Sequence, residues 1–167
     1  MNRTLLSLIA FVASIGMSYA HAVPRIEVFE YGTYAAPPGL VEGFTTEGLE
    51  HLGIEHVELI EKTRTVVAQV GTEFGFRYRL IGIAKNEAIP ITIVMKFPPP
   101  GMSAPGESRR FMRDDYTVVL PAGDDWYEGW WFSDRDYIVP GLWTFEIWCE
   151  GKKLAEQTFE VILPPIS

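Results

Sequence analysis

The chain has a single cysteine, Cys149, among its 167 residues. One cysteine cannot form an internal disulfide, so a hydrophobic core must hold the fold unaided. Cys149 falls on the apolar side of its predicted strand, where a thiol packs as a small hydrophobe. A reactive thiol would need exposure and a histidine or cationic neighbour, and the surrounding sequence offers neither. We therefore predict a buried, unreactive cysteine.

Histidine is almost as scarce, with three in the chain. His51 and His56 delimit a segment that resembles an inverted zinc-protease motif in outline. The spacing does not fit that motif, because two helical residues five apart lie about 140° apart around the axis. A loop would still allow zinc to bind, with Glu55 or Glu58 as a further ligand. We predict no metal site and no cofactor, and a metal-dependent hydrolase remains the second alternative.

Motifs for nucleophilic catalysis and for phosphate binding are missing. The sequence has no Gly-x-Ser-x-Gly elbow and no glycine-rich loop followed by Lys and Ser or Thr. Its paired aspartates fall in predicted turns, without the spacing of a calcium loop: Asp114-Asp115, Asp124-Asp125 and Asp134-Arg135-Asp136. None of the 22 acidic residues is marked out as half of a glycosidase pair. We predict that the protein is not an enzyme.

Positive charge is also in short supply, since the net charge is −8. An acidic domain is repelled by phosphate backbones and by anionic lipid surfaces. We expect no nucleic-acid partner.

A long apolar run occurs at the start of the chain. Arg3 provides a positive end, Leu5–Met17 is too short to span a bilayer, and residues 20–22 offer a small-x-small cleavage site. We predict a secretory signal peptide over Met1–Ala22 and a single domain over residues 23–167. The expected location is periplasmic or secreted, without a membrane span after cleavage.

Short strands separated by Gly and Pro turns account for most of the remaining sequence. The clearest is residues 73–80, in which Phe74, Phe76, Tyr78 and Leu80 alternate with Gly75, Arg77 and Arg79. Other strands are predicted at 25–34, 57–70, 89–97, 116–120 and 128–132. We expect a bulge or a close backbone approach at Gly75, and one helical turn near Glu47–Leu52. This pattern predicts an all-β fold, an antiparallel immunoglobulin-like β-sandwich of about seven strands.

The last part of the chain, residues 140–161, has the alternation of a hairpin with one face on a core. A two-residue loop at Glu150-Gly151 would place apolar residues of one strand opposite polar residues of the other. We therefore expect a loop of about three or five residues that keeps Trp143 and Phe145 level with Phe159 or its neighbours.

Several of these segments resemble a bacterial family of small domains catalogued as a domain of unknown function. The resemblance rests on glycine, proline and aromatic positions: Gly71–Tyr78, Phe97-Pro98-Pro99, Trp130-Trp131-Phe132, Val139–Trp143 and Phe159–Val161. Such residues specify a fold, and the family supplies no catalytic residues to carry across. The resemblance implies an immunoglobulin-like sandwich.

Aromatic residues crowd into the stretch from Trp126 to Trp148. If Trp130 points into the core, alternation turns Trp131 outward, and Trp148 takes the polar side of the hairpin. Exposed aromatics form platforms for sugar rings or for partner proteins, unless a loop such as residues 40–55 covers them. We predict Tyr127, Trp131 and Trp148 as binding residues. The expected function is an exported, non-catalytic domain that binds a protein or envelope component, with a carbohydrate-binding module as the first alternative.

Overall fold

The computed structural model describes residues 24–35, 40–44, 50–53, 57–85, 87–103 and 108–165, with the backbone alone for 40–44 and 50–53. Eleven strands and one short 3-10 helix lie within these residues. They are β1 (Arg25–Ala35), β2 (Leu40–Phe44), β3 (Glu50–Gly53), β4 (Glu58–Glu61), β5 (Thr65–Val67), β6 (Glu73–Ile81), β7 (Ala88–Lys96), β8 (Arg113–Pro121), β9 (Asp125–Trp131), η1 (Arg135–Tyr137), β10 (Gly141–Cys149) and β11 (Lys152–Ile162).

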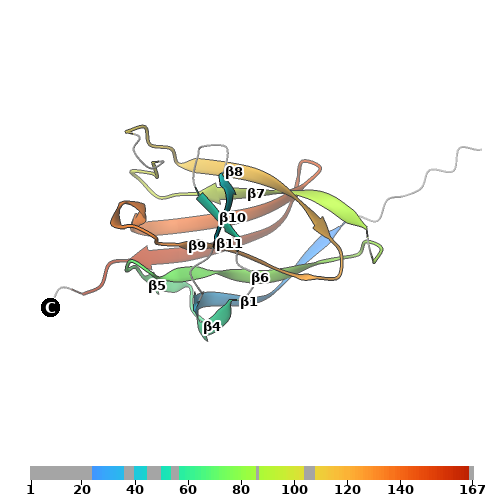
Figure 1. The fold of residues 1–167 in the computed structure, drawn as a ribbon, viewed down its shortest axis with the longest axis horizontal. Helices are drawn as coiled ribbons and strands as arrows, with labels where there is room; N and C mark the ends of the chain where they lie inside the picture. The colour runs from blue at the N-terminus through green and yellow to red at the C-terminus, as the bar shows by residue number, and fades with distance from the viewer. Residues whose placement is uncertain are drawn as a thin grey trace, which may run out of the picture.

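The strands form two main sheets (Figure 1). The four-stranded sheet has the order β4-β1-β6-β9, and the five-stranded sheet has the order β5-β11-β10-β7-β8. Neighbours pair antiparallel apart from β5 and β11, which are parallel. β2 and β3 pair with each other as a separate hairpin. The prediction of an all-β, mostly antiparallel sandwich is confirmed.

The described strands outnumber the predicted seven for two reasons. The run 57–70 is divided, since β4 joins the four-stranded sheet and β5 joins the other. The chain bends between them where the Thr65 N–H donates to Thr63 Oγ1 at 3.1 Å, a local bond that competes with ladder pairing. In addition, residues 50–53 are a strand, so the helical turn expected near Glu47–Leu52 is wrong at residues 50–52.

The terminal hairpin corrects the expected loop length. Its connection is a two-residue turn in which Glu150 has φ 48° and Gly151 has φ 75°, the combination that fits a right-handed strand twist. The apolar faces still match, because a β-bulge shifts the register between Ile147 and Trp148. Trp143 pairs directly with Phe159, as predicted.

Aromatic rings fill the space between the two sheets. Phe74 lies at the centre, with its ring centroid 5.3–6.0 Å from the rings of Phe132, Trp143, Phe145 and Phe159. Edge-to-face arrangements dominate, which is the geometry that aromatic quadrupoles favour. Cys149 is buried on the same side of its sheet, as predicted, and burial raises the pKa of its thiol.

None of the helices found in the described residues is long and apolar enough to cross a bilayer.

Candidate functional site

Three glycines line up across the outer face of the four-stranded sheet. Gly32 of β1 pairs directly with Gly75 of β6, and Gly75 pairs directly with Gly129 of β9. Their missing side chains leave a trough across three strands, and other groups approach the backbone there. A Cβ atom at Gly32 would collide with the Glu61 carbonyl oxygen, and one at Gly75 with the Glu128 carbonyl oxygen. The close approach expected at Gly75 is therefore present.

The side chain of Tyr127 occupies this glycine trough. A Cβ atom at Gly75 would lie 2.7 Å from Tyr127 Oη, and one at Gly129 would collide with it. The phenol crosses both glycines and donates a 2.6 Å hydrogen bond to Glu73 Oε1. Burial raises the pKa of Tyr127 well above its ordinary value, and the neighbouring Glu73 raises it further. The phenol therefore stays protonated and acts as a donor.

A second tyrosine packs on the first. The ring of Tyr34 meets that of Tyr127 edge to face, with centroids 5.0 Å apart. Tyr34 is 2% exposed, and its hydroxyl has no hydrogen-bond partner within the part of the chain that the structure describes. Burial, with a smaller contribution from Glu30, raises the pKa of Tyr34. The buried Tyr34 and the partly buried Tyr127 thus pack together on the outer face of this sheet.

Glu73 is the charged residue at the centre of this arrangement. It pairs in register with Tyr34 on one side and with Trp131 on the other. It is 2% exposed, and Oε2 has no hydrogen-bond partner among the described residues. Burial raises the pKa of Glu73 to about 7, against the lowering effect of the bond from Tyr127. A carboxylate with one donor and an unpaired buried oxygen is costly in a fold, and such groups concentrate at functional sites.

A cleft of about 490 Å³ opens beside Glu73. We call it the edge cleft, because its walls come from β1, from β4 and β5 at the ends of the two sheets, and from the turn leading into β6. Tyr34 and Glu73 contribute to its lining together with Glu61, Gln69 and Thr72. Glu73 is only 2% exposed although it lines the cleft, so it lies at the cleft floor.

Exposed apolar side chains gather around the edge cleft. Within the described residues nine large apolar side chains are exposed, and three of them, Ile60, Val67 and Val70, line the cleft. Ile162, which pairs with Val67 across β11 and β5, and the adjacent Leu163 are exposed as well. Five of the nine are thus at one edge of the sandwich, so the exposed apolar surface is concentrated there.

A different buried carboxylate lies on the inner side of the same sheet. Glu128 accepts a 2.7 Å hydrogen bond from Tyr116 Oη, which joins β9 to β8 across the sandwich. Burial raises the pKa of Glu128 to about 8, although the bond from Tyr116 lowers it. Because Glu128 pairs with the inward-facing Phe76, it faces away from the edge cleft. We assign Glu128 and Tyr116 a structural role.

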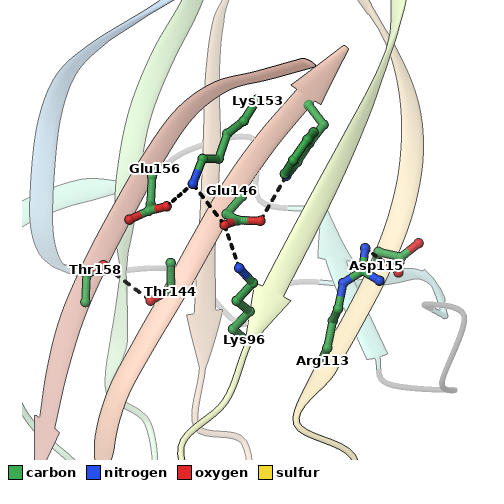
Figure 2. A network of polar contacts seen from close by, with 9 residues as sticks. Lys96, Arg113, Asp115, Thr144, Glu146, Lys153, Glu156 and Thr158 are labelled. Carbon is green, nitrogen blue, oxygen red and sulfur yellow. Dashed lines mark hydrogen bonds and ion pairs between the residues drawn. The ribbon is translucent and has the colours of Figure 1, made fainter. Parts of the chain in front are cut away.

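The outer face of the five-stranded sheet carries a network of paired charges (Figure 2). Glu146 Oε1 accepts bonds from Lys96 at 2.7 Å and from Lys153 at 3.2 Å, and Oε2 accepts the Trp148 indole N–H at 2.9 Å. Burial alone would raise the pKa of Glu146, but these donors lower it to about 2. Lys153 also contacts Glu156. Both oxygens of Glu146 are bonded, in contrast to Glu73.

The three predicted binding residues divide between the two faces. Tyr127 and Trp131 share the outer face of the four-stranded sheet, where Trp131 pairs in register with Glu73 and Tyr127 donates a hydrogen bond to it. Trp148 lies on the outer face of the other sheet, beside Glu146. The structure therefore brings two of the three together and separates the third. Trp130 is buried in the core, which meets the condition under which alternation turns Trp131 outward.

Residues that sequence reasoning missed are Glu73 and Tyr34. Glu73 has the parity of Arg77 and Arg79, which predicts an exposed side chain, so alternation gave no sign of its burial. The positions of Gly75 and Gly129 were the available signal that another side chain could cover this face of the sheet. His51 lies in β3, where the backbone alone is described, and His56 lies outside the described residues. No group of three His, Cys, Asp or Glu side chains within the described ranges is placed to hold a metal ion.

A family comparison matches residues 23–161 to the family described as "Domain of unknown function (DUF3859)". The chain belongs to this family. The resemblance to a family of unknown function is thereby confirmed, and the family's description names no activity. A comparison with curated proteins finds no match.

The fold has a counterpart among solved structures. The chain is similar to the crystal structure of an immunoglobulin-like protein (PA1606) from Pseudomonas aeruginosa, with 25% sequence identity and a TM-score of 0.61. The match covers 86% of this chain and 99% of that chain. The predicted immunoglobulin-like architecture is confirmed.

Proposed function

We propose that this protein is an exported, non-catalytic binding domain that attaches to a protein of the cell envelope through the edge cleft. The observation that carries the proposal is the gathering of exposed apolar side chains around a cleft that has the buried Glu73 at its floor. Apolar patches with polar groups at defined positions are typical of binding surfaces on monomeric domains.

The position of the cleft favours a polypeptide ligand. β4 and β5 are the terminal strands of the two sheets, and both border the cleft. An extended segment of another chain binds well at such an edge, because main-chain hydrogen bonds provide affinity and alternate side chains enter pockets. Val67 and Ile60 supply apolar contacts for those side chains.

The placement of the two buried carboxylates supports binding over catalysis. Hydrolysis by a pair of acids requires both carboxyl groups to face one substrate. Glu73 faces the edge cleft on the outer side of the sheet, whereas Glu128 faces the sandwich interior. The two therefore do not converge on a common position.

Export is supported by the predicted signal peptide over Met1–Ala22 and by the start of the family match at residue 23. We expect the protein recovered from a periplasmic or culture-medium fraction to begin at Val23. Intact-mass measurement and amino-terminal sequencing test this, and an uncleaved chain retained in the cytoplasm would contradict it.

The binding proposal is tested by site-specific photo-crosslinking. A benzophenone amino acid replaces Val70 at the rim of the cleft, and a matched control replaces Val119, which is exposed on β8 of the other sheet. We expect a defined adduct with one envelope protein from position 70 and none from position 119. The partner, once purified, should bind the unmodified domain and lose binding to a Val70→Asp variant of unchanged thermal stability. Equal adducts from both positions, or binding unaffected by that substitution, would overturn the proposal.

A further inference from the structure

We propose that the edge cleft receives a lysine side chain of the partner, and that Glu73 is the counter-ion that its ammonium group meets. This inference rests on the proposed function, since it names the group that the partner presents. It begins from Glu73, which lines the cleft and whose buried oxygen Oε2 has no hydrogen-bond partner among the described residues.

The hydrogen bonding of Glu73 leaves room for one compact donor. Tyr127 already donates to Oε1, and Oε2 has no donor among the described residues. A guanidinium binds a carboxylate best through both oxygens at once, so an arginine would compete with Tyr127. An ammonium is a point donor and needs a single oxygen. The free acceptor therefore matches lysine better than arginine.

The charges around the cleft favour a cation. Glu61 and Glu73 both line it, and none of its lining residues is a lysine or an arginine. The neighbouring cations have other partners. Arg77, on the same face of β6 as Glu73, lies 3.8 Å from Glu30 Oε1. Lys62 Nζ lies 5.3 Å and the Arg64 guanidinium 4.1 Å from the ring centre of Tyr31. Among the described residues, the lining of the cleft therefore carries negative charge without a basic side chain of its own.

The walls of the cleft fit the stem of the same side chain. Lysine places its charge at the end of four methylene groups, and that stem packs well on apolar surface. Ile60, Val67 and Val70 line the cleft around its carboxylate floor. A metal ion would gain nothing from these apolar walls and would need several more ligands than the cleft provides.

Binding of an ammonium group should be coupled to a proton. The pKa of Glu73 is raised to about 7 by burial, so near neutral pH part of the protein carries the neutral acid. The bound cation favours the ionised form, and that fraction must release its proton. Within the described part of the chain, the ionisable groups around Glu73 are Tyr34 of β1, Glu61 of β4 and Tyr127 and Glu128 of β9. The tyrosines remain protonated, because burial raises the pKa of each.

The test uses the mature chain and two blocked pentapeptides that differ at one position. Both have valine on each side of the centre; one has lysine there, and the other has norleucine. Titration calorimetry should show that the lysine peptide binds about tenfold or more tightly, and that this preference disappears in Glu73→Gln. A matched control, Glu128→Gln, should keep the preference, because that carboxylate faces the interior. Thermal melts of both variants establish that they are folded.

A second measurement needs no substitution. Affinity for the lysine peptide should fall as pH drops from 8 to 6, and near neutral pH binding should release a fraction of a proton, measured in buffers of different ionisation enthalpy. Equal affinity for the two peptides, no binding of either, or a preference kept in Glu73→Gln would overturn the inference. If position 70 still crosslinks to a partner in that case, the proposed function stands and the lysine alone is wrong; if those crosslinks are also missing, the proposed function fails with it.

Discussion

Tyr127 reaches from β9 across two glycines to donate a 2.6 Å hydrogen bond to Glu73 on β6. The bond joins an aromatic residue and an acid that are 54 positions apart in the chain, on the outer face of the sheet. Because Glu73 lines the edge cleft, this pair links the packing of the four-stranded sheet to the proposed binding site.

The glycine beneath the phenol can be tested directly. Gly129→Ala places a methyl group against Tyr127 Oη and 2.5 Å from the Phe74 carbonyl oxygen, so the ring must move. We expect a loss of about 2–3 kcal/mol in the free energy of unfolding, the usual cost of overpacking. The control is Gly151→Ala, where the space is open and only the positive φ of 75° opposes a side chain, at a cost of about 1 kcal/mol. Urea denaturation measures both, and equal losses would contradict the crowding at Gly129.

Removing the phenol oxygen should have an effect that depends on pH. Tyr127→Phe removes the hydrogen bond to Glu73 Oε1. Among the described residues, this is the one side-chain hydrogen bond that Glu73 accepts. An ionised, buried carboxylate without a donor costs about 1–3 kcal/mol more than a paired one. We expect a larger loss of stability at pH 8.5, where Glu73 is ionised, than at pH 5.5, where it is neutral. Urea titrations at the two pH values check this, and the same loss at both would show that the bond does not stabilise the charge.

Stability should decline as the solution becomes alkaline. Glu73 and Glu128 have pKa values of about 7 and about 8 in the folded protein, raised in both cases by burial from the ordinary value of 4.5. Between pH 4.5 and these raised pKa values, the folded state therefore keeps protons that the unfolded chain has released. The stabilisation is fully present below about pH 4.5 and is lost as pH rises through 7 and 8.

We expect the melting temperature to fall by several degrees between pH 5.5 and pH 9, and Glu73→Gln and Glu128→Gln each to flatten part of that slope. Differential scanning calorimetry across this range provides the measurement. A melting temperature that rises with pH would show that the two carboxyl groups ionise freely in the fold.

The network on the opposite sheet should behave in the reverse sense. Lys96 and Lys153, with the Trp148 indole, hold the pKa of Glu146 at about 2, against the effect of its burial (Figure 2). The stabilisation it contributes is present above about pH 4.5 and is lost as pH falls towards 2. At pH 7, Glu146→Gln should cost about 2 kcal/mol, less than a fully buried pair because both lysines are partly exposed.

The matched control for that substitution is Glu156→Gln. Glu156 contacts Lys153 on the exposed side of the same network, and surface pairs of this kind contribute about 0.5 kcal/mol. Equal losses for Glu146→Gln and Glu156→Gln in urea denaturation would place Glu146 among ordinary surface charges.

Local alternation was enough to predict the core. Phe74 and Phe76 point inward because the period of a strand is two and each strand has one apolar side, so their burial follows from residues beside them in the chain. The same reasoning placed Trp143 level with Phe159 or its neighbours, and the two pair directly. It gave the wrong loop for that hairpin, since a β-bulge near Trp148 changes the register by one residue and leaves no mark in the alternation.

The candidate site followed from alternation only in part. Tyr127 and Trp131 were identified as outward-facing, and the structure places both next to Glu73. Trp148 has the same outward character but belongs to the other sheet, because strand parity says which side of a sheet a residue faces and not which sheet it lies in. The division of residues 57–70 between β4 and β5, which creates the edge cleft, likewise depends on how the two sheets end.

The sequence by itself determined that this chain is an all-β sandwich with an aromatic core and a buried cysteine, because those properties depend on neighbouring residues and on the two-residue period of a strand. Tertiary structure alone decided that Glu73, on the side that alternation assigns to solvent, is buried. Its burial requires glycines from β6 and β9 to lie side by side and a tyrosine from β9 to lie flat across them. Contacts between segments so distant in the chain are set by sheet pairing, which no local pattern contains.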